Sequence, residues 1–213
     1  MSHRGDRTSP ERTPTSALLA NLGLFVFNEF LDAELCGKIR SELRVATGSQ
    51  AMICRKGVAL VDVDARRTES VVAKVPTMAL VQARLQGLRP ALESHFNLRL
   101  TGCETPQFLI YKKGDFFLPH QDSSAEPEDP PHIKARRVSV VIFLNGETEE
   151  PGVPSYTGGS LVFYELIDDP RLMRYGLPLV SEPGMLVAFR SDLLHEVEAV
   201  AQGERYTIVS WFF

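Results

Sequence analysis

From about residue 100 onward, the chain is a succession of short runs rich in valine, isoleucine and aromatic residues. Glycine, proline or acidic residues separate these runs, which read PQFLIYKKG, RRVSVVIFLN, GGSLVFYEL, GMLVAFRS, HEVEAV and RYTIVSWFF. Several short strands at this spacing are typical of a β-sandwich or barrel. We therefore expect a mainly β fold, and this pattern limits the possible architectures more than any other feature of the sequence.

Two helices are expected before this strand-rich region. The first follows a short strand in LFVFNEFLDAELCGKIRSELRVA, with Asp32 as its N-cap and Leu35, Ile39 and Leu43 along one face. The second is expected in TMALVQARLQGLRPALESHF, with a break or kink near Pro90, which has no N–H to donate within a helix. Both helices should pack on one face of the sheet system as supports.

Length and composition indicate one domain. The 213 residues, 44 % of them hydrophobic, suffice for a single core over residues 17–213, with helical support over 17–100 and the strand-rich core over 101–213. The polar opening, MSHRGDRTSPERTPTS, is predicted to be a disordered tail over residues 1–16.

Three cysteines without a CxxC pair indicate reduced thiols and a cytoplasmic setting. No apolar run approaches the roughly 18 residues of a membrane span, and 23 basic against 27 acidic residues argue against a nucleic-acid partner.

The stretch FLPHQDS places His120 and Asp122 two residues apart. Alternate residues of a strand project from the same face, so an imidazole and a carboxylate can point toward one position. His195 begins a later predicted strand and can supply a third ligand, because a β-sandwich brings distant strands face to face. Taken singly, each of these residues is usually an ordinary surface or hydrogen-bonding side chain. Together they form the two-histidine, one-carboxylate set that non-haem Fe(II) oxygenases use.

Arg205 stands ten residues after His195 and opens the run RYTIVSWFF. The planar guanidinium of arginine matches a carboxylate better than the point charge of lysine does. Thr207, on the same strand face, adds a hydroxyl. Alone, Arg205 would be interpreted as a surface-facing strand residue, but beside the three candidate metal ligands we interpret it as a carboxylate-binding residue.

These motifs together resemble the Fe(II)- and 2-oxoglutarate-dependent dioxygenases, and within them the prolyl 4-hydroxylase-like branch. The similar text is YKKGDFFLPHQD, VVIFLN, GGSLVFYE, PGMLVAF, HEVEAV and RYTIVSWFF, in the usual order of the family and within about residues 107–213. The resemblance implies a double-stranded β-helix, or jelly roll, with the N-terminal helices packed outside it. It also implies hydroxylation of a C–H bond with Fe(II), 2-oxoglutarate and O2, and with succinate and carbon dioxide as coproducts.

Carried over residue by residue, the resemblance assigns His120, Asp122 and His195 to Fe(II) and Arg205 to the distal carboxylate of 2-oxoglutarate. The presence of Asp122 favours hydroxylation, because halogenating relatives replace that carboxylate with a small residue. A protein or peptide, or a small molecule, would be the substrate.

Other positions match the family less specifically. Tyr111 matches a position whose phenol lies near the cosubstrate in relatives, although it can also be a half-buried barrel tyrosine. Phe117 and Trp211 match the substrate pocket, and Phe117 stands where collagen-type prolyl hydroxylases often carry tyrosine, which leaves the prolyl-substrate geometry open. Gly158 and Gly159 indicate a tight turn or a close strand approach.

Several functions remain compatible with the sequence. The preferred one is hydroxylation of a prolyl residue in a protein or peptide, and the second keeps the chemistry but acts on a free amino acid or another small metabolite. The third is a non-catalytic jelly-roll binding module or a cupin-like metal protein, although cupins usually present an HxH pair rather than the HxD found here. A nucleic-acid demethylase is disfavoured by the negative charge, although DARRT and IKARR keep it open. The irregular segments Ser123 to Arg136 and Asp168 to Leu177 are expected to flank the mouth of the barrel.

Overall fold

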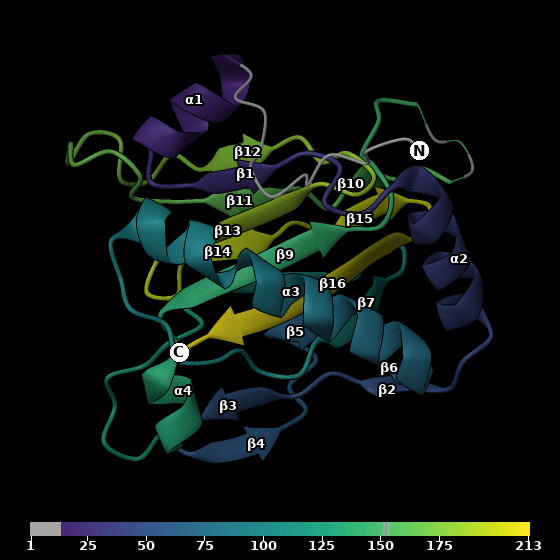
Figure 1. The fold of residues 1–213 in the computed structure, drawn as a ribbon, viewed down its shortest axis with the longest axis horizontal. Helices are drawn as coiled ribbons and strands as arrows, with labels where there is room; N and C mark the ends of the chain where they lie inside the picture. The colour runs from purple at the N-terminus through teal and green to yellow at the C-terminus, as the bar shows by residue number, and fades with distance from the viewer. Residues whose placement is uncertain (1–13, 151, 153) are drawn as a thin grey trace, which may run out of the picture.

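The structure, a computed structural model, describes residues 14–150, 152 and 154–213 (Figure 1). The helices in these residues are α1 (Pro14–Asn21), α2 (Ala33–Arg44), α3 (Val75–Phe96) and α4 (Pro131–Ala135).

The strands form two large sheets and two smaller pairs. A seven-stranded sheet has the order β1 (Phe25–Phe27), β13 (Leu186–Arg190), β9 (Val138–Phe143), β16 (Arg205–Phe212), β7 (Gln107–Tyr111), β6 (Glu69–Val71) and β2 (Gly48–Gln50). A five-stranded sheet has the order β12 (Leu177–Leu179), β11 (Leu161–Phe163), β14 (His195–Val197), β8 (Phe116–His120) and β5 (Arg66–Arg67). Two smaller pairs are β3 (Ile53–Arg55) with β4 (Val58–Leu60), and β10 (Thr157–Gly158) with β15 (Val200–Gln202).

The two large sheets enclose a core between them. Leu109 and Phe143 of the seven-stranded sheet belong to the same buried cluster as Phe163 and Val197 of the five-stranded sheet. The strand pairs within both sheets are antiparallel. The predicted mainly β jelly roll is therefore confirmed, and its two sheets can bring residues distant in the sequence to one interior space.

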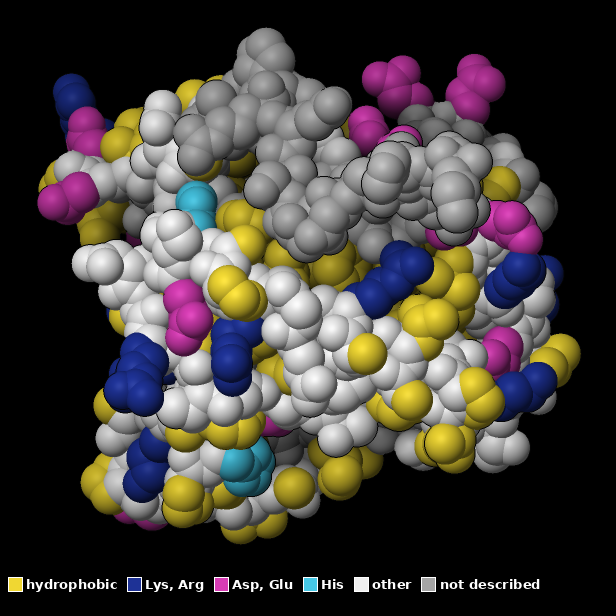
Figure 2. Space-filling view, viewed as in Figure 1, with side chains coloured by type: hydrophobic (Ala, Val, Ile, Leu, Met, Phe, Trp, Pro, Cys, Tyr) yellow, Lys and Arg dark blue, Asp and Glu magenta, His cyan; other side chains and the backbone are white. Residues whose placement is uncertain are grey.

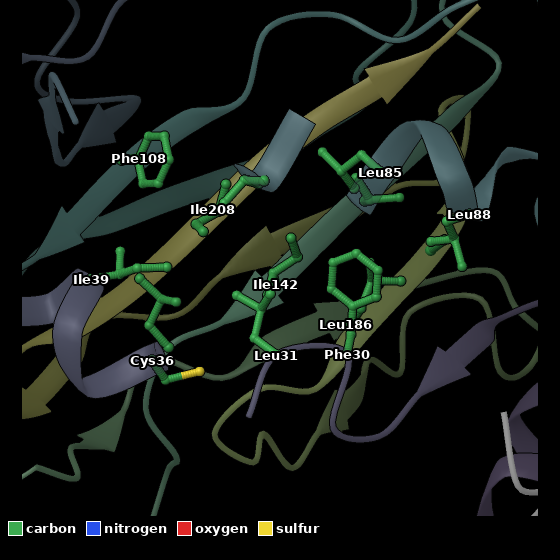
Figure 3. Close-up of a cluster of buried hydrophobic side chains, with 14 of the residues drawn as sticks. Phe30, Leu31, Cys36, Ile39, Leu85, Leu88, Phe108, Ile142, Leu186 and Ile208 are labelled. Atoms are coloured by element: carbon green, nitrogen blue, oxygen red, sulfur yellow. The ribbon is translucent and has the colours of Figure 1, made fainter. Parts of the chain in front are cut away.

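A second core lies outside the jelly roll, where α2 and α3 cover the seven-stranded sheet (Figure 1). Ile39 of α2 and Leu85 of α3 belong to one cluster with Phe108, Ile142 and Ile208 of the sheet, as Figure 3 shows. The predicted apolar faces of the two helices thus have the expected partner. This packing fixes the seven-stranded sheet from behind and leaves its inner face free to build a site.

The boundaries of these helices follow local chemistry. The Asp32 side chain accepts a hydrogen bond from the backbone N–H of Leu35 at 2.7 Å, so the predicted N-cap is confirmed. Helix α3 is continuous through Pro90, and the predicted break is absent. Buried Leu88 and Leu92 on either side of Pro90 hold both parts of α3 on the sheet, while Pro90 itself is exposed.

The N-terminal half differs from the expected helical support over residues 17–100, because it also contributes strands. Strands β2 and β6 extend the seven-stranded sheet, β5 joins the five-stranded sheet, and the β3–β4 hairpin stands beside α4 (Figure 1). Each of these strands has two or three residues, too few for a visible hydrophobic alternation. The predicted tail over residues 1–16 lies outside the described residues up to residue 13, and its last three residues belong to α1.

The surface of the helix-bearing face mixes charges of both signs. Figure 2 shows Lys and Arg side chains scattered among Asp, Glu and apolar side chains over this face, rather than gathered into one basic surface. Among the described residues, no helix is both long enough and apolar enough to span a bilayer.

Replacing Asp32 with alanine should lower the free energy of unfolding by about 1 kcal/mol, because the first turn of α2 loses its side-chain cap. Urea denaturation of the two proteins measures this difference. Glu34→Ala is the matched control, since Glu34 is exposed in the same turn and pairs only with exposed Lys38, so its loss should cost at most about 0.5 kcal/mol. Equal losses in the two variants would contradict the capping role.

Candidate metal centre and cavity

Two paired strands of the five-stranded sheet, β8 and β14, and the segment that follows β8 bring His120, Asp122 and His195 together. His120 ends β8 and His195 begins β14, and the two residues face each other in the register of these paired strands. Asp122 follows β8 directly, and its backbone N–H and that of Ser123 both donate to the carbonyl of Ser191 at 2.9 Å. Strand pairing thus positions the imidazoles, and this forked hydrogen bond positions the carboxylate.

The three side chains converge on one point. Asp122 Oδ1 lies 3.7 Å from His120 Nε2, and Asp122 Oδ2 lies 3.6 Å from His195 Nε2. The candidate ligand atoms all lie within 4.8 Å of one another, and among the described residues this is the one cluster of three such groups. A single divalent cation could contact all three.

Each histidine is oriented by a backbone carbonyl. His120 Nδ1 donates to the Leu118 carbonyl at 2.8 Å, and His195 Nδ1 donates to the Leu193 carbonyl at 2.9 Å. A carbonyl can only accept, so Nδ1 carries the proton in both rings and Nε2 retains its lone pair. Metal-binding histidines are typically fixed in this way through their other nitrogen.

The electrostatics of the cluster favour metal binding. Burial and the neighbouring His195 lower the pKa of His120 to about 3, so its ring is neutral at pH 7. Burial is the largest influence on Asp122 and opposes its ionisation, but interactions with His195 and His120, together with hydrogen bonds from Trp211 and Ser139, hold the pKa of this carboxyl below its ordinary value. An ionised carboxylate beside a neutral imidazole is the protonation state that coordinates a divalent ion.

Arg205 opens β16 and lies inside the jelly roll with only 1 % of its surface exposed. Its guanidinium carbon lies 5.0 Å from the ring centroid of Tyr111 and 5.2 Å from that of Phe143. Nη1 is 3.5 Å from the Thr207 hydroxyl, whereas Nε and Nη2 are buried without a hydrogen-bond partner in the described part of the chain. Because a buried, unpaired charge is costly, this arrangement fits an anion with a carboxylate, such as 2-oxoglutarate.

Gly158 and Gly159 have positive φ angles of 64° and 70°, which glycine adopts without strain. A Cβ atom on Gly159 would lie 2.8 Å from Val200 Cγ2 and 3.4 Å from Arg205 Cδ. Of the two alternatives that the paired glycines suggested, the close approach is therefore present, and it is next to Arg205.

A cavity of about 560 Å³ joins the metal cluster to Arg205. All eight side chains that the sequence assigned to metal, cosubstrate or substrate line this cavity: His120, Asp122, His195, Arg205, Thr207, Tyr111, Phe117 and Trp211. Phe117 stacks on His120, with ring centroids 3.5 Å apart and an interplanar angle of 18°. The structure thus brings the candidate residues together around one cavity.

The sequence missed two parts of the cavity wall. One is the β3–β4 hairpin, which lines the cavity next to the segment before α4, where the Gly57 N–H donates to Asp129 Oδ1 at 2.9 Å. The other is a pair of arginines, Arg66 and Arg136, whose stretches DARRT and IKARR suggested only local basic charge. Arg136 lies 3.7 Å above the ring of Trp211 and binds Glu104 through two nitrogens, at 2.6 and 2.9 Å.

The two long segments have different positions. Residues of the Ser123 to Arg136 segment line the cavity, including Asp129 and the exposed His132. No residue of the Asp168 to Leu177 segment lines it, so the prediction that this segment flanks the mouth is wrong. It connects β11 to the edge strand β12, and this connection directs it away from the β8 side of the five-stranded sheet.

Comparison with known proteins matches the family model described as the 2OG-Fe(II) oxygenase superfamily over residues 106–213. No curated protein matches the sequence.

Among solved structures, a Pseudomonas putida prolyl-4-hydroxylase has 24 % identity and a TM-score of 0.64, with 92 % of this chain and 97 % of that chain covered. A Trichoplax adhaerens prolyl hydroxylase in complex with a hypoxia inducible factor peptide fragment has 19 % identity and a TM-score of 0.65, with 95 % and 94 % covered. A viral collagen prolyl hydroxylase from Paramecium Bursaria Chlorella virus-1, in its 2OG complex, has 16 % identity and a TM-score of 0.55, with 89 % and 94 % covered. At these identities, the likenesses show the fold.

Proposed function

We propose that this chain, which belongs to the 2OG-Fe(II) oxygenase superfamily and is an Fe(II)- and 2-oxoglutarate-dependent dioxygenase, hydroxylates a prolyl residue of a protein or peptide. Membership of the family supports the reaction class, and the residues that line the cavity support the roles assigned to single residues. The prolyl substrate is the part of the proposal that requires a test.

His120, Asp122 and His195 would hold Fe(II), and Arg205 would bind the distal carboxylate of 2-oxoglutarate. When bound, the iron and the cosubstrate use O2 to supply an oxidant that can hydroxylate a C–H bond, with succinate and carbon dioxide as coproducts. Thr207 would add a hydroxyl to the carboxylate site, and Tyr111 would cover one side of the guanidinium. The aromatic rings around Arg205 exclude water and so strengthen its interaction with an anion.

The observation that best supports this assignment is the buried guanidinium of Arg205, which lies in the same cavity as the metal cluster and has two nitrogens without a hydrogen-bond partner among the described residues. A metal-binding structural module would not need a buried cation that lacks a counter-charge. A dicarboxylate cosubstrate supplies that counter-charge, which disfavours the alternative of a non-catalytic binding module.

The shape of the cavity wall supports a peptide over a free amino acid. Met52 of the hairpin side and Leu118 of β8 both line the cavity, and they remain 59 % and 48 % exposed. Apolar surface therefore continues from the cavity to the outside, as an extended chain would require, whereas a site for a free metabolite is usually enclosed. Proline-containing peptides favour an extended helix, which lowers the ordering cost of binding in such a groove.

The substrate proposal is tested by 2-oxoglutarate turnover with proline-containing peptides, with the same peptides carrying alanine for proline, and with free proline. We expect the proline-containing peptides to stimulate succinate formation above the uncoupled background and to gain one oxygen atom, detected by mass spectrometry. Stimulation by free proline alone would overturn the peptide assignment in favour of the small-molecule alternative. Oxygen addition to the alanine peptides would overturn prolyl specificity.

We further propose that the catalytic unit is one domain over residues 17–213, since β5 and β6 join the same two sheets as the C-terminal strands. A cytoplasmic setting is our proposal as well. It is supported by Cys36, Cys54 and Cys103, which form no disulfide.

A further inference from the structure

The cavity contains a second buried guanidinium without a counter-charge, that of Arg66, and we propose that it binds a carboxylate of the substrate. This inference rests on the proposed function, because it names a chemical feature of the substrate that the same site would take. It adds a recognition element that contacts the ring of Phe117, which in turn stacks on the metal ligand His120.

Arg66 is placed by the short strand β5, where it faces Phe117 in the register of β5 with β8. It is 8 % exposed and lines the cavity. Its guanidinium carbon lies 4.6 Å from the ring centroid of Phe117, and Phe117 in turn stacks on His120. The charge of Arg66 is therefore separated from a metal ligand by one aromatic ring.

Most hydrogen-bonding capacity of this guanidinium is unused. Nη1 donates to the carbonyl of Met52 at 3.1 Å. Nε is buried without a partner, and Nη2 makes no hydrogen bond to any described residue. A guanidinium offers five N–H donors in a plane that matches a carboxylate. Arg66 thus retains the donors that a carboxylate in the cavity would use.

Among the described charged side chains that line the cavity, Arg66 is the arginine without a counter-charge. The other arginines of the cavity wall each have a counter-charge, in the structure or in the proposed complex: Asp62 for Arg55 at 3.0 Å, Glu104 for Arg136 at 2.6 Å, and the cosubstrate for Arg205. No ion pair forms between Arg66 and an acidic side chain among the described residues. Because burial of an unpaired charge is unfavourable, a ligand that neutralises it gains affinity from the interaction.

This geometry defines a substrate by two features. The C–H bond that reacts must lie at the metal cluster, and the carboxylate must lie beyond Phe117, so the two groups are separated within the substrate. An acidic side chain next to the reacting residue of a peptide has this arrangement, and the α-carboxylate of an amino acid is a second source of the same group.

The experiment measures binding to the Mn(II)- and 2-oxoglutarate-loaded protein without oxygen, by the fluorescence of Trp211, which is the single tryptophan of the chain and lines the cavity. The probes are three pairs, each with one member that carries the carboxylate and one that carries the amide. The first pair is a blocked tetrapeptide with aspartate or asparagine beside proline, and the second pair has leucine in place of that proline. The third pair is L-proline and L-prolinamide. We expect the aspartate peptide to bind at least about ten-fold more tightly than its asparagine partner. Arg66→Met should reduce this preference to within about two-fold and leave the asparagine affinity unchanged.

Arg67→Met is the matched control, because Arg67 is the exposed neighbour on β5 and stacks on Phe116 in a similar way. It should retain the preference for aspartate, and Arg66→Lys should restore part of it. A preference confined to L-proline over L-prolinamide would identify the α-carboxylate as the source of the group.

Three results would overturn the inference: equal affinity for acid and amide probes in the unmodified protein, no saturable binding of any carboxylate probe, or equal weakening of both probes by Arg66→Met. The last would show that Arg66 only supports Phe117 and Met52. Failure of the proposed prolyl function would give a different result. The aspartate peptide with leucine in place of proline would still bind more tightly than its asparagine partner, while no proline peptide would stimulate turnover.

Discussion

Replacing His195 with alanine is expected to abolish succinate formation and to weaken Fe(II) binding by more than about 100-fold. Loss of a residue that only hydrogen-bonds a metal ligand weakens metal binding by up to about 100-fold, and loss of a ligand itself should weaken it more. The reason is that Asp122 and His120 would remain as two protein ligands, with no third side chain within reach among the described residues. Anaerobic equilibrium dialysis measures bound iron, and alanine at His120 or Asp122 should have the same effect.

His132→Ala is the matched control for this variant, since His132 is another histidine of the cavity wall but lies outside the metal cluster. It should bind iron normally. His195 is almost fully buried and its ring contacts that of Phe189, so thermal unfolding of the metal-free variant must show that the fold persists. His195→Gln, which keeps more of the volume, provides a second test. Full iron binding by either His195 variant would contradict the assignment.

The second large effect is expected for Arg205→Met, which should raise the Michaelis constant for 2-oxoglutarate by about 30-fold to several thousand-fold. This range corresponds to about 2 to 5 kcal/mol for loss of a buried charge-assisted pair. Iron affinity should stay near its starting value, because Arg205 is not part of the metal cluster. Steady-state turnover and iron dialysis measure the two quantities.

The stability of the Arg205→Met variant without ligand gives a second test. Arg205 has two buried nitrogens without partners, so an apolar side chain of similar length should leave the metal-free protein as stable as before or more stable. Arg55→Met is the control, because Arg55 also lines the cavity but pairs with Asp62, and it should not affect the Michaelis constant for 2-oxoglutarate. An unchanged constant for Arg205→Met would show that another residue binds the cosubstrate.

The longer strands of the C-terminal half could be predicted well from the sequence, because they have enough residues to show their pattern. Strands β9 and β16 have six and eight residues, and nearly all of them are buried. Strand β5 has two residues, both arginine, and its presence depends on pairing with β8 rather than on any local preference. The N-terminal strands were therefore missed for a physical reason, since tertiary contacts alone stabilise them.

The candidate site shows a similar division. His120 and Asp122 could be recognised by their spacing of two residues, which gives a shared direction in a strand. In the structure β8 ends at His120, and backbone hydrogen bonds to the Ser191 carbonyl position Asp122 instead. Arg66 and Arg67 are identical neighbours in the sequence, yet one is buried and the other exposed. Only the strand that pairs with them decides which side faces the cavity, so the role of Arg66 could not be predicted before the fold was known.

The central claim is that His120, Asp122 and His195 hold one Fe(II) ion, and anomalous diffraction at the iron edge from crystals grown without oxygen tests it most directly. We expect one peak, about 2 Å from Nε2 of each histidine and from a carboxylate oxygen of Asp122, by analogy with the bond lengths of other first-row ions. Both Nδ1 atoms should keep their hydrogen bonds to the Leu118 and Leu193 carbonyls. A crystal that contains iron elsewhere, or none between these three side chains at saturating Fe(II), would contradict the account.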